Sequence, residues 1–314
     1  MIVPFQCSAF ESSLEAFRFV SLLPLEENKD NRRWNCFHSF IAKGSGDIED
    51  HCTLLCSFLL GFGLDAYIVI GNYKEDRRIW ILTRETMISS PLKIIYYWEP
   101  ITGQRFESSN PNVKKYCNTI SCVFNNKVMY ANLQANNGMD NVSYDFEDRK
   151  YWSGLEVSSL VSPWSFPIKL FESTINTIEL EEQIEVFLKD KICYYRESTL
   201  MSRTEFDESM SYILTPAVSK WEIEKVYELK SSQEELVAAI YNVIPDGHIF
   251  KAFPVETRSI NPQEVFSNVM QNKITKNMID TNSNELKFAL KTKVTPYPEK
   301  ITVVWTILAI TYSD

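Results

Sequence analysis

The chain has 314 residues, of which 45% are hydrophobic and 13% are aromatic, and its formal net charge is −9. This composition is typical of a folded globular protein and excludes a disordered or fibrous chain, while the length allows two domains. The acidic balance argues against nucleic acid as a partner, because a phosphate backbone requires a basic surface.

The cysteines and histidines do not form a recognisable metal or disulfide pattern. The seven cysteines include no C-x-x-C pair and no signal peptide precedes them, so we expect reduced thiols in a cytoplasmic protein. The three histidines (His38, His51 and His248) are too scattered for a histidine metal site. No phosphate-binding loop, dinucleotide motif or membrane-length apolar run is present, so we expect no cofactor, no metal and no transmembrane segment.

The N-terminal part of the chain is predicted to be helical. Residues 11–24 have the apolar spacing of an amphipathic helix, and Pro24 ends it before a charged loop. Residues 34–42 predict a second, short helix. A longer helix follows the turn at residues 44–46, because Asp47 is a suitable N-cap and Asp50 lies at the capping-box position. These acids therefore have a structural explanation that requires no catalysis.

The following segments predict an antiparallel sheet packed on that helix. They are rich in β-branched and aromatic residues and are separated by short polar links. Three strands are expected at residues 66–71, 78–84 and 93–98, then a hairpin at residues 113–133. The acidic and aromatic segment 144–152 is expected to close the sheet edge.

A change in composition marks a domain boundary. Residues 158–177 contain two prolines and several serines, so we place a first domain at 1–160, a linker at 161–177 and a second α+β domain at 178–314. The last strand is strongly apolar and is therefore expected at the centre of its sheet. The second-domain elements predicted are helices at 178–195, 205–226, 233–243 and 262–273, and strands at 248–255, 286–294 and 301–311. The first of these helices is too short for a coiled coil, so we favour a packed surface helix.

The segment 46–50 is similar to the active-site helix of transglutaminase-like cysteine enzymes with the cysteine replaced. Ile48 stands where the nucleophile would be, and its hydrocarbon side chain cannot attack a carbonyl. Arg78, two residues before a Trp, stands at the position of the base, but a guanidinium has no lone pair to accept a proton. Glu99, in a Trp-Glu-Pro turn, replaces the acid. We therefore predict a pseudoenzyme that has no catalytic residues. Ile48, Arg78 and Glu99 occupy the degenerate triad positions.

Another thiol could in principle replace the missing nucleophile. Cys52 and Cys56 follow Ile48 by four and eight residues and share its helical face. A reactive thiol benefits from the positive end of the helix dipole, whereas these two lie one and two turns inside an apolar stripe. We favour buried core cysteines. The alternative is an active cysteine peptidase, deamidase or transglutaminase with a displaced nucleophile.

The chain resembles the 76-kDa centrosomal protein family and, more distantly, the coiled-coil and C2 domain proteins of the ciliary transition zone. The resemblance rests on GDIEDH (46–51), LLGFGLDAY (59–67), WEPITGQRF (98–106), ISCVFN (120–125), PDGHIFKAFP (245–254), YPE (297–299) and VW (304–305). The resemblance extends over most of residues 12–312.

The resemblance implies an α+β fold: a degenerate transglutaminase-like (papain-type cysteine peptidase) domain with an antiparallel sheet, followed by a distinct C-terminal domain. It also implies a non-enzymatic scaffold of the centriole, basal body or cilium in the cytoskeleton, with regulation of centriole duplication as one role. Its partners would be centriolar or ciliary proteins, or microtubule-associated assemblies. A structural component of axonemal microtubules is the alternative. Members of this family usually carry a C2 domain ahead of this module.

The abandoned active site predicts a specific contact. A cysteine-protease scaffold has a groove between helix and sheet that is shaped for an extended peptide. Because Arg78 and Glu99 stand where base and acid would meet, we expect them to form a charge-assisted pair in that groove.

Overall fold

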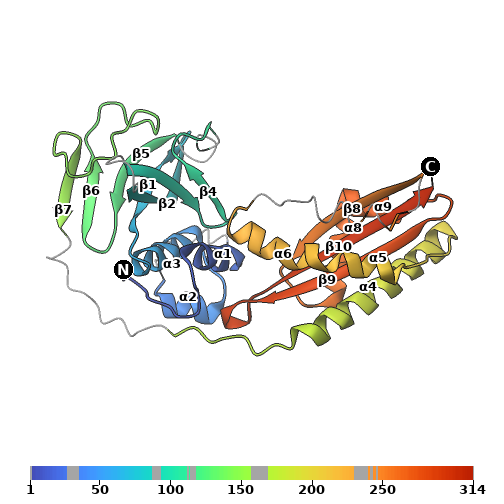
Figure 1. Ribbon diagram of the computed structural model, residues 1–314. Helices are drawn as coiled ribbons and strands as arrows, with labels where there is room; N and C mark the ends of the chain where they lie inside the picture. Colours follow the sequence, from blue (N-terminus) through green and yellow to red (C-terminus); the bar gives the residue numbers. More distant parts are fainter. Residues whose placement is uncertain are drawn as a thin grey trace. The chain divides into compact units, whose positions relative to one another are not determined.

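The structure is a computed structural model that describes residues 2–26, 35–86, 93–111, 113, 118–156, 169–229, 240, 243–244 and 247–313. The chain forms two compact units, residues 1–171 and 172–314, and the division falls within the predicted linker. Each unit combines helices with an antiparallel sheet, as expected (Figure 1). Most of the predicted helix 233–243, and residues 161–168 of the linker, lie outside the described residues.

In its described residues, the first unit contains three α-helices and a seven-stranded sheet. Its elements are α1 (Ser13–Leu22), α2 (Phe37–Lys43), α3 (Ile48–Gly61), β1 (Asp65–Tyr73), β2 (Asp76–Thr86), β3 (Lys93–Glu99), β4 (Gln104–Glu107), β5 (Thr119–Phe124), β6 (Val128–Asn132) and β7 (Trp152–Glu156). The strand order is β4-β3-β2-β1-β5-β6-β7, and all neighbours are antiparallel. The predicted meander of β1, β2 and β3 and the hairpin of β5 and β6 are therefore confirmed.

The two faces of this sheet are buried in different ways. On one face α3 packs on β1 and β2 and against α1, and Trp98 lies edge-on to Phe17 of α1, with 5.0 Å between ring centroids. Side chains alternate along a strand, so Trp80 and Tyr97 point to the opposite face. That face is a separate apolar cluster to which the loop after β6 contributes Met139 and Phe146. The aromatic content of β2 and β3 thus fills both faces.

The segment 144–152 does not form the predicted edge strand. It is a turn-rich loop in which Phe146 is fully buried, with its ring 4.8 Å from that of Trp152. The edge is formed instead by β7, which starts at Trp152. The aromatic residues of the segment serve the cluster under the sheet rather than a ladder, which explains why their β-propensity was misleading.

The described part of the second unit is a three-stranded sheet between two groups of helices. Its elements are α4 (Thr177–Leu200), α5 (Glu208–Ile213), α6 (Thr215–Val226), β8 (His248–Thr257), α8 (Pro262–Gln271), α9 (Lys273–Ile279), β9 (Lys287–Pro296), the 3-10 turn η3 (Pro298–Lys300) and β10 (Thr302–Ser313). The strand order is β8-β10-β9, so the prediction of a central final strand is confirmed. The predicted helix 205–226 is divided at Leu214, and α9 was not predicted.

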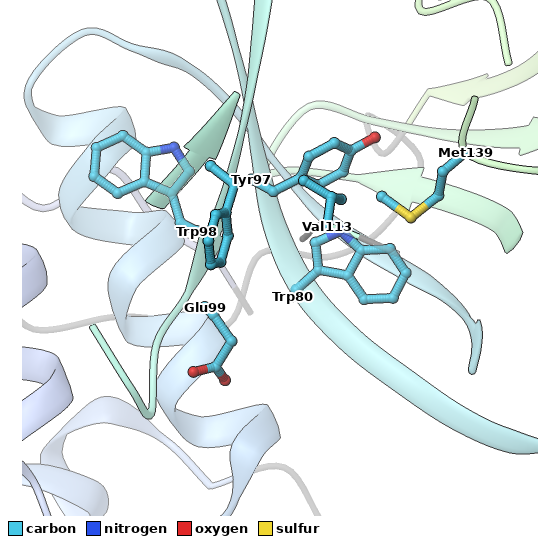
Figure 2. Close-up of a pocket in the computed structure, with 7 residues that line it drawn as sticks. Trp80, Tyr97, Trp98, Glu99, Val113 and Met139 are labelled. Atoms are coloured by element: carbon cyan, nitrogen blue, oxygen red, sulfur yellow. The ribbon is translucent and has the colours of Figure 1, made fainter. Parts of the chain in front are cut away.

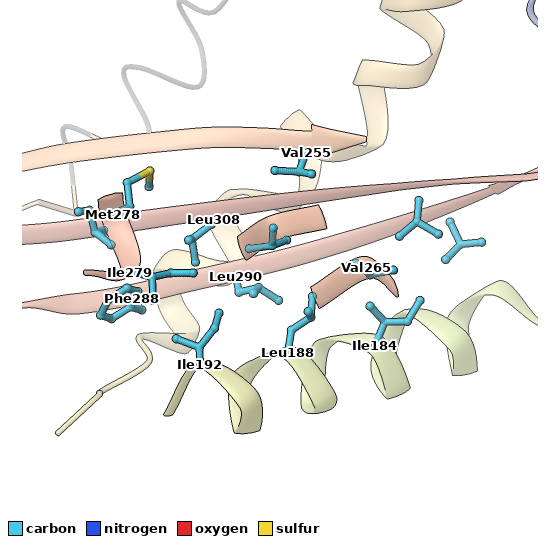
Figure 3. Packing of buried hydrophobic residues seen from close by; sticks show 14 residues of the cluster. Ile184, Leu188, Ile192, Val255, Val265, Met278, Ile279, Phe288, Leu290 and Leu308 are labelled. Carbon is cyan, nitrogen blue, oxygen red and sulfur yellow. The ribbon is translucent and has the colours of Figure 1, made fainter. Parts of the chain in front are cut away.

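Both faces of the small sheet are covered. Figure 3 shows Ile184, Leu188 and Ile192 of α4 packed under Phe288 and Leu290 of β9, in a cluster that also includes α8 and α9. A second cluster joins α5 and α6 to the other face of β9 and β10. This two-sided burial explains why β10 is nearly continuously apolar.

The acids of α4 have a structural role at the edge of this sheet. Glu185 accepts a hydrogen bond from the Thr292 backbone N–H at 2.8 Å, and Glu181 accepts one from Val294 at 3.0 Å. The exposed strand edge of β9 is therefore occupied by a packed surface helix, as the sequence favoured. The opposite edge, β8, carries Lys251 and Pro254, which both disfavour pairing with another strand.

Candidate functional site

The start of α3 is built by hydrogen bonds among its acids. Asp47 accepts from the Asp50 N–H at 2.9 Å, and Asp50 accepts from the Asp47 N–H at 3.3 Å, so the predicted capping box is present. Asp50 also accepts from the Asn35 backbone and side chain at 3.1 and 2.7 Å. Ile48, at the predicted nucleophile position, is half-buried at the first helical position. These acids hold the start of α3 in place.

His51 is a structural residue. It is fully buried, with Nδ1 2.7 Å from the Asp47 carbonyl oxygen and Nε2 3.1 Å from the Leu23 carbonyl oxygen. The imidazole therefore connects the first turn of α3 to the segment after α1. Both ring nitrogens face backbone oxygens, which leaves neither of them for a substrate.

The two thiols that follow Ile48 are inaccessible. Cys52 and Cys56 are both fully buried in α3, as the apolar stripe predicted. Burial raises the pKa of both thiols, and for Cys52 the negative charge of Glu99 raises the pKa further. The thiolate form that a nucleophile needs is therefore disfavoured at both positions.

The predicted ion pair between Arg78 and Glu99 is wrong. Glu99 accepts hydrogen bonds from the Thr102 backbone N–H and hydroxyl, both at 2.6 Å, and among the described residues its carboxylate has no cationic partner within 4 Å. Arg78 is exposed on β2, in register with Gly71 of β1. The last register pair between β2 and β3 is at Ile81, so Arg78 lies about 10 Å further along its strand. The Glu99 carboxylate thus accepts its hydrogen bonds within a local turn. Arg78 does not pair with it, because Arg78 lies three residues beyond the last register pair of β2 and β3.

The structure brings only part of the predicted site together. Glu99, at the end of β3, is close enough to α3 to act electrostatically on Cys52. Arg78 pairs with neither Glu99 nor any other acid in the described part of the chain. The three predicted triad positions therefore lie on the expected helix and strands but form no hydrogen bonds with one another.

A small cavity that sequence reasoning missed lies beside Glu99. Its volume is about 20 Å³, and its lining residues are Trp80, Tyr97, Trp98, Glu99, Phe106, Val113 and Met139 (Figure 2). Of these, only Glu99 and Phe106 are partly exposed. We call this the Trp80 cavity. The aromatic runs in β2 and β3 were the available signal, but strand propensity explained them equally well.

A buried arginine joins the sheet to the loop after β6. The Arg84 guanidinium donates to Asp65 at 2.7 Å, to Tyr67 at 3.0 Å, and to both carboxylate oxygens of Glu147 at 3.0 Å each. The central carbon of the guanidinium, Cζ, lies 4.5 Å from the Phe146 ring centroid. No local sequence signal links residues so far apart in the chain.

In the second unit, two of the segments that carry the family resemblance, YPE (297–299) and VW (304–305), bind the same carboxylate. Glu222 of α6 is buried and accepts from the Tyr297 hydroxyl and from Trp305 Nε1, each at 2.6 Å. The YPE and VW segments therefore fasten α6 to the sheet through Tyr297 and Trp305.

The described part of the chain offers no metal-ion site and no helix that could span a membrane. There, no three His, Cys, Asp or Glu side chains gather in a way that would hold a metal ion. Among the same residues, no helix combines the length and the apolarity that crossing a bilayer requires.

Comparison with known proteins matches both units. A family model described as the CEP76 peptidase-like domain matches residues 32–155, and one described as the Centrosomal protein of 76 kDa C-terminal domain matches residues 173–313. The zebrafish (Danio rerio) Centrosomal protein of 76 kDa is 31% identical over 329 residues, covering 96% of this chain and 49% of the relative. Human Protein CC2D2B is 26% identical, covering 93% of this chain and 20% of its own length.

The chain spans about half the length of the 76-kDa curated relatives that it matches. Among solved structures, calcium-bound LapG of Legionella pneumophila has a TM-score of 0.31 and 12% identity, over 38% of this chain and 66% of that one. That likeness is too weak to define the fold.

Proposed function

Because the chain belongs to the family of the 76-kDa centrosomal protein, we propose that it is a non-enzymatic binding protein of the centrosome. In this proposal the first unit has a transglutaminase-like fold whose catalytic chemistry has been lost. The observation that carries it is the state of the former triad: Ile48 has no nucleophilic atom, Arg78 has no lone pair, and Glu99 is bound by Thr102.

The order of elements supports this fold. The helix α3, with the former nucleophile position at its first residue, is followed by the antiparallel strands β1, β2 and β3, and the two other positions lie on β2 and β3. Removing nucleophile and base leaves only a small residual rate in enzymes of this type. A groove of this kind that no longer reacts remains able to bind an extended segment of another protein.

The proposed partners are centrosomal proteins, including those of centrioles, basal bodies and cilia. The names of the relatives support the centrosome and cytoskeleton as the location. The net charge of −9 suits a basic protein partner better than acidic tubulin or nucleic acid. The second form of this proposal is a permanent structural component of axonemal microtubules. Such a component would be present at a fixed stoichiometry along the microtubule, whereas a centrosomal binding protein would not.

The test of this function is proximity labelling from the endogenously tagged full protein, imaged in dividing and in ciliated cells. Enrichment of centriolar proteins at discrete foci is the expected result. Labelling spread along axonemes at constant density would favour the structural component. A diffuse signal with unrelated neighbours would contradict both.

The alternative, an enzyme with a displaced nucleophile, makes an opposite prediction about thiol reactivity. In the folded protein we expect iodoacetamide to modify exposed Cys36 at least ~10-fold faster than Cys52 or Cys56, because each unit of raised pKa removes a factor of about 10 in thiolate. A hydrogen bond with Ser39 lowers the pKa of Cys36. Mass spectrometry of peptides after brief labelling measures the order.

A Cys36→Ser variant is the control for this measurement, since it removes the fast site without touching α3. If fast labelling persisted at Cys52 and disappeared in Cys52→Ser, the displaced-nucleophile alternative would be revived.

A further inference from the structure

Arg196, near the end of α4, is a buried cation whose printed acceptors are all uncharged. Its side chain is 1% exposed. It donates hydrogen bonds to the Thr204 hydroxyl at 3.0 Å, to the Thr281 carbonyl oxygen at 2.7 Å and to the Ile279 carbonyl oxygen. Among the described residues, no carboxylate lies within 4 Å of its guanidinium nitrogens. Because charged groups are rarely buried unless they are paired, Arg196 lacks a counter-charge.

Asp280 does not supply this counter-charge. Burial lowers the pKa of the Arg196 guanidinium, and the negative charge of Asp280 offsets only part of that effect. One carboxylate oxygen of Asp280 accepts from the Tyr195 hydroxyl at 3.0 Å, and the other lies 3.3 Å from Lys276 Nζ. This acid is therefore already bound by other residues.

The buried Arg84 shows the usual arrangement of such a group. Its guanidinium donates to the carboxylates of Asp65 and Glu147. Against the effect of burial, these hydrogen bonds raise the pKa of Arg84, whereas the pKa of Arg196 is lowered. The surroundings of Arg196 therefore favour the addition of an anion.

One edge of the Arg196 guanidinium is available for that anion. Nη1 donates to the two backbone carbonyl oxygens. Nε donates to Thr204 Oγ1, and no described residue accepts a hydrogen bond from Nη2. Nε and Nη2 together form the edge with which an arginine binds a phosphate through two parallel hydrogen bonds. The Thr204 hydroxyl thus lies at this edge.

The sequence around Thr204 is that of a substrate for an acid-directed kinase. Thr204 is followed by carboxylates at the first, third and fourth positions, which are Glu205, Asp207 and Glu208. Glu205 and Glu208 are exposed. Acid-directed serine/threonine kinases select such a pattern, because their basic groups attract these carboxylates. Thr204 itself is half-buried, in the irregular segment 201–205 between α4 and α5.

We propose that Thr204 is a phosphorylation site and that the buried Arg196 guanidinium binds its phosphate. In the reaction Thr204 Oγ1 attacks the γ-phosphorus of ATP. The new O–P bond replaces the bond to the β-phosphate oxygen, ADP leaves, and the hydroxyl proton passes to the catalytic base of the kinase. The phosphate carries about 1.5 to 2 negative charges at neutral pH, which supplies the counter-charge of Arg196.

The acids that attract the kinase also repel the phosphate, but more weakly than Arg196 attracts it. Glu205 and Glu208 are exposed, so solvent and salt screen their charges. The hydrogen bonds from the buried guanidinium are charge-assisted and little screened. The phosphate therefore strengthens the connection between the segment after α4 and the end of α9. This proposal is independent of the centrosomal function.

The first test incubates the full chain with ATP and casein kinase II, an acid-directed kinase. A peptide of residues 198–210 is the reference in which the hydroxyl is fully accessible. Mass spectrometry should locate phosphate on Thr204 in both. The folded chain should react more slowly, because backbone hydrogen bonds of Glu205 and Asp207 with Phe288 of β9 must open locally.

Two variants control for the position of the phosphate. Thr204→Val should lose the modification, and Ser202→Ala, which removes a neighbouring hydroxyl, should keep it. A folded chain that carries no phosphate on Thr204, under conditions that phosphorylate the peptide fully, would overturn the site.

The second test asks whether Arg196 binds the phosphate. A phosphate held by a guanidinium remains dianionic to lower pH, so its second pKa, ordinarily about 6, should fall by about one unit relative to the phosphorylated peptide. Titration followed by ³¹P NMR measures this shift. Arg203→Gln is the control, because Arg203 is exposed beside Thr204 in the sequence and its loss should leave the shift unchanged. A titration equal to that of the peptide, or a shift lost in Arg203→Gln, would exclude Arg196 as the receptor.

The third test asks whether cells use the site. The endogenous protein, isolated from dividing cells with phosphatases inhibited, is expected to carry phosphate on Thr204. If Thr204 is modified by the purified kinase but never in the cell, the proposal of a physiological site is wrong. Because this readout requires no centrosomal partner, it can fail or succeed separately from the proximity labelling.

Discussion

Replacing Arg84 with alanine is expected to destabilise the first unit by about 3 kcal/mol, because it removes a buried guanidinium and the hydrogen bonds that it donates. The side chain is 3% exposed and serves acceptors on two segments: Asp65 and Tyr67 of β1, and Glu147 in the loop after β6. Removing it leaves two carboxylates and the buried Tyr67 hydroxyl without their donor. The ring of Phe146 also loses its cation contact at 4.5 Å.

Hydrogen exchange of the amides in β1 and β2 measures this effect within the two-unit chain, where a single melting temperature would mix both units. Arg78→Ala is the matched control, because Arg78 is on the same face of the same strand but exposed. We expect its free energy of unfolding to change by less than about 0.5 kcal/mol. Similar losses in the two variants would contradict the network as the cause.

The same network should make the stability of the first unit depend on acid. Hydrogen bonds from Arg84 lower the pKa of Glu147 from 4.5 to about 2. A carboxyl with a lower pKa in the folded state stabilises the fold above its unfolded pKa, and this contribution is lost as pH falls from about 4.5 toward 2.

Glu147 is 60% exposed, so solvent and salt reduce the size of this acid effect. In Glu147→Gln we expect the fall in stability between about pH 4.5 and 2 to become shallower. Amide exchange of β1 measured across this pH range, at low salt, detects the change. An unchanged slope in that variant would exclude Glu147 as its source.

Arg196→Ala is expected to destabilise the second unit by about 3–5 kcal/mol, because it removes a buried donor and leaves a cavity. The side chain, near the end of α4, is 1% exposed. It donates to the Thr204 hydroxyl at 3.0 Å, to the Thr281 carbonyl oxygen at 2.7 Å, and to the Ile279 carbonyl oxygen. It therefore fixes the ends of α4 and α9 with a single planar group.

Arg196→Lys should recover little of this stability, since one ammonium cannot reproduce the spread of the guanidinium donors. Arg203→Ala is the control: Arg203 is exposed in the loop that follows α4, and its removal should be nearly neutral. The free energy of unfolding of all three variants is measured by chemical denaturation, with amide exchange in β9 and β10 as the signal. Full rescue by lysine would show that charge alone, rather than the fork of donors, matters at this position.

Local features were predictable from the sequence because they depend on neighbours in the chain. The capping box of Asp47 and Asp50 needs only three residues of spacing, and the burial of Cys52 and Cys56 follows from their place on an apolar helical stripe. The central position of β10 follows in the same way from its continuous apolar sequence. These predictions succeeded since each rests on the periodicity of a single element.

Contacts between elements were not predictable in this way. The Arg78–Glu99 pair failed because the register of β2 and β3 ends at Ile81, and no single-strand pattern contains that information. The segment 144–152 was misassigned for a related reason: its aromatic residues fill a cluster under the sheet instead of joining the ladder.

The sequence by itself determined the family and the two-part α+β organisation, and it predicted which residues stand at the triad positions. Only the tertiary structure decided what surrounds them: the turn that occupies Glu99, the cavity beside Trp80 and the arginine networks. Arg84 and Glu147 are 63 residues apart, and Arg196 and Ile279 are 83 apart. Such pairs are set by packing of distant segments, which local propensity does not encode.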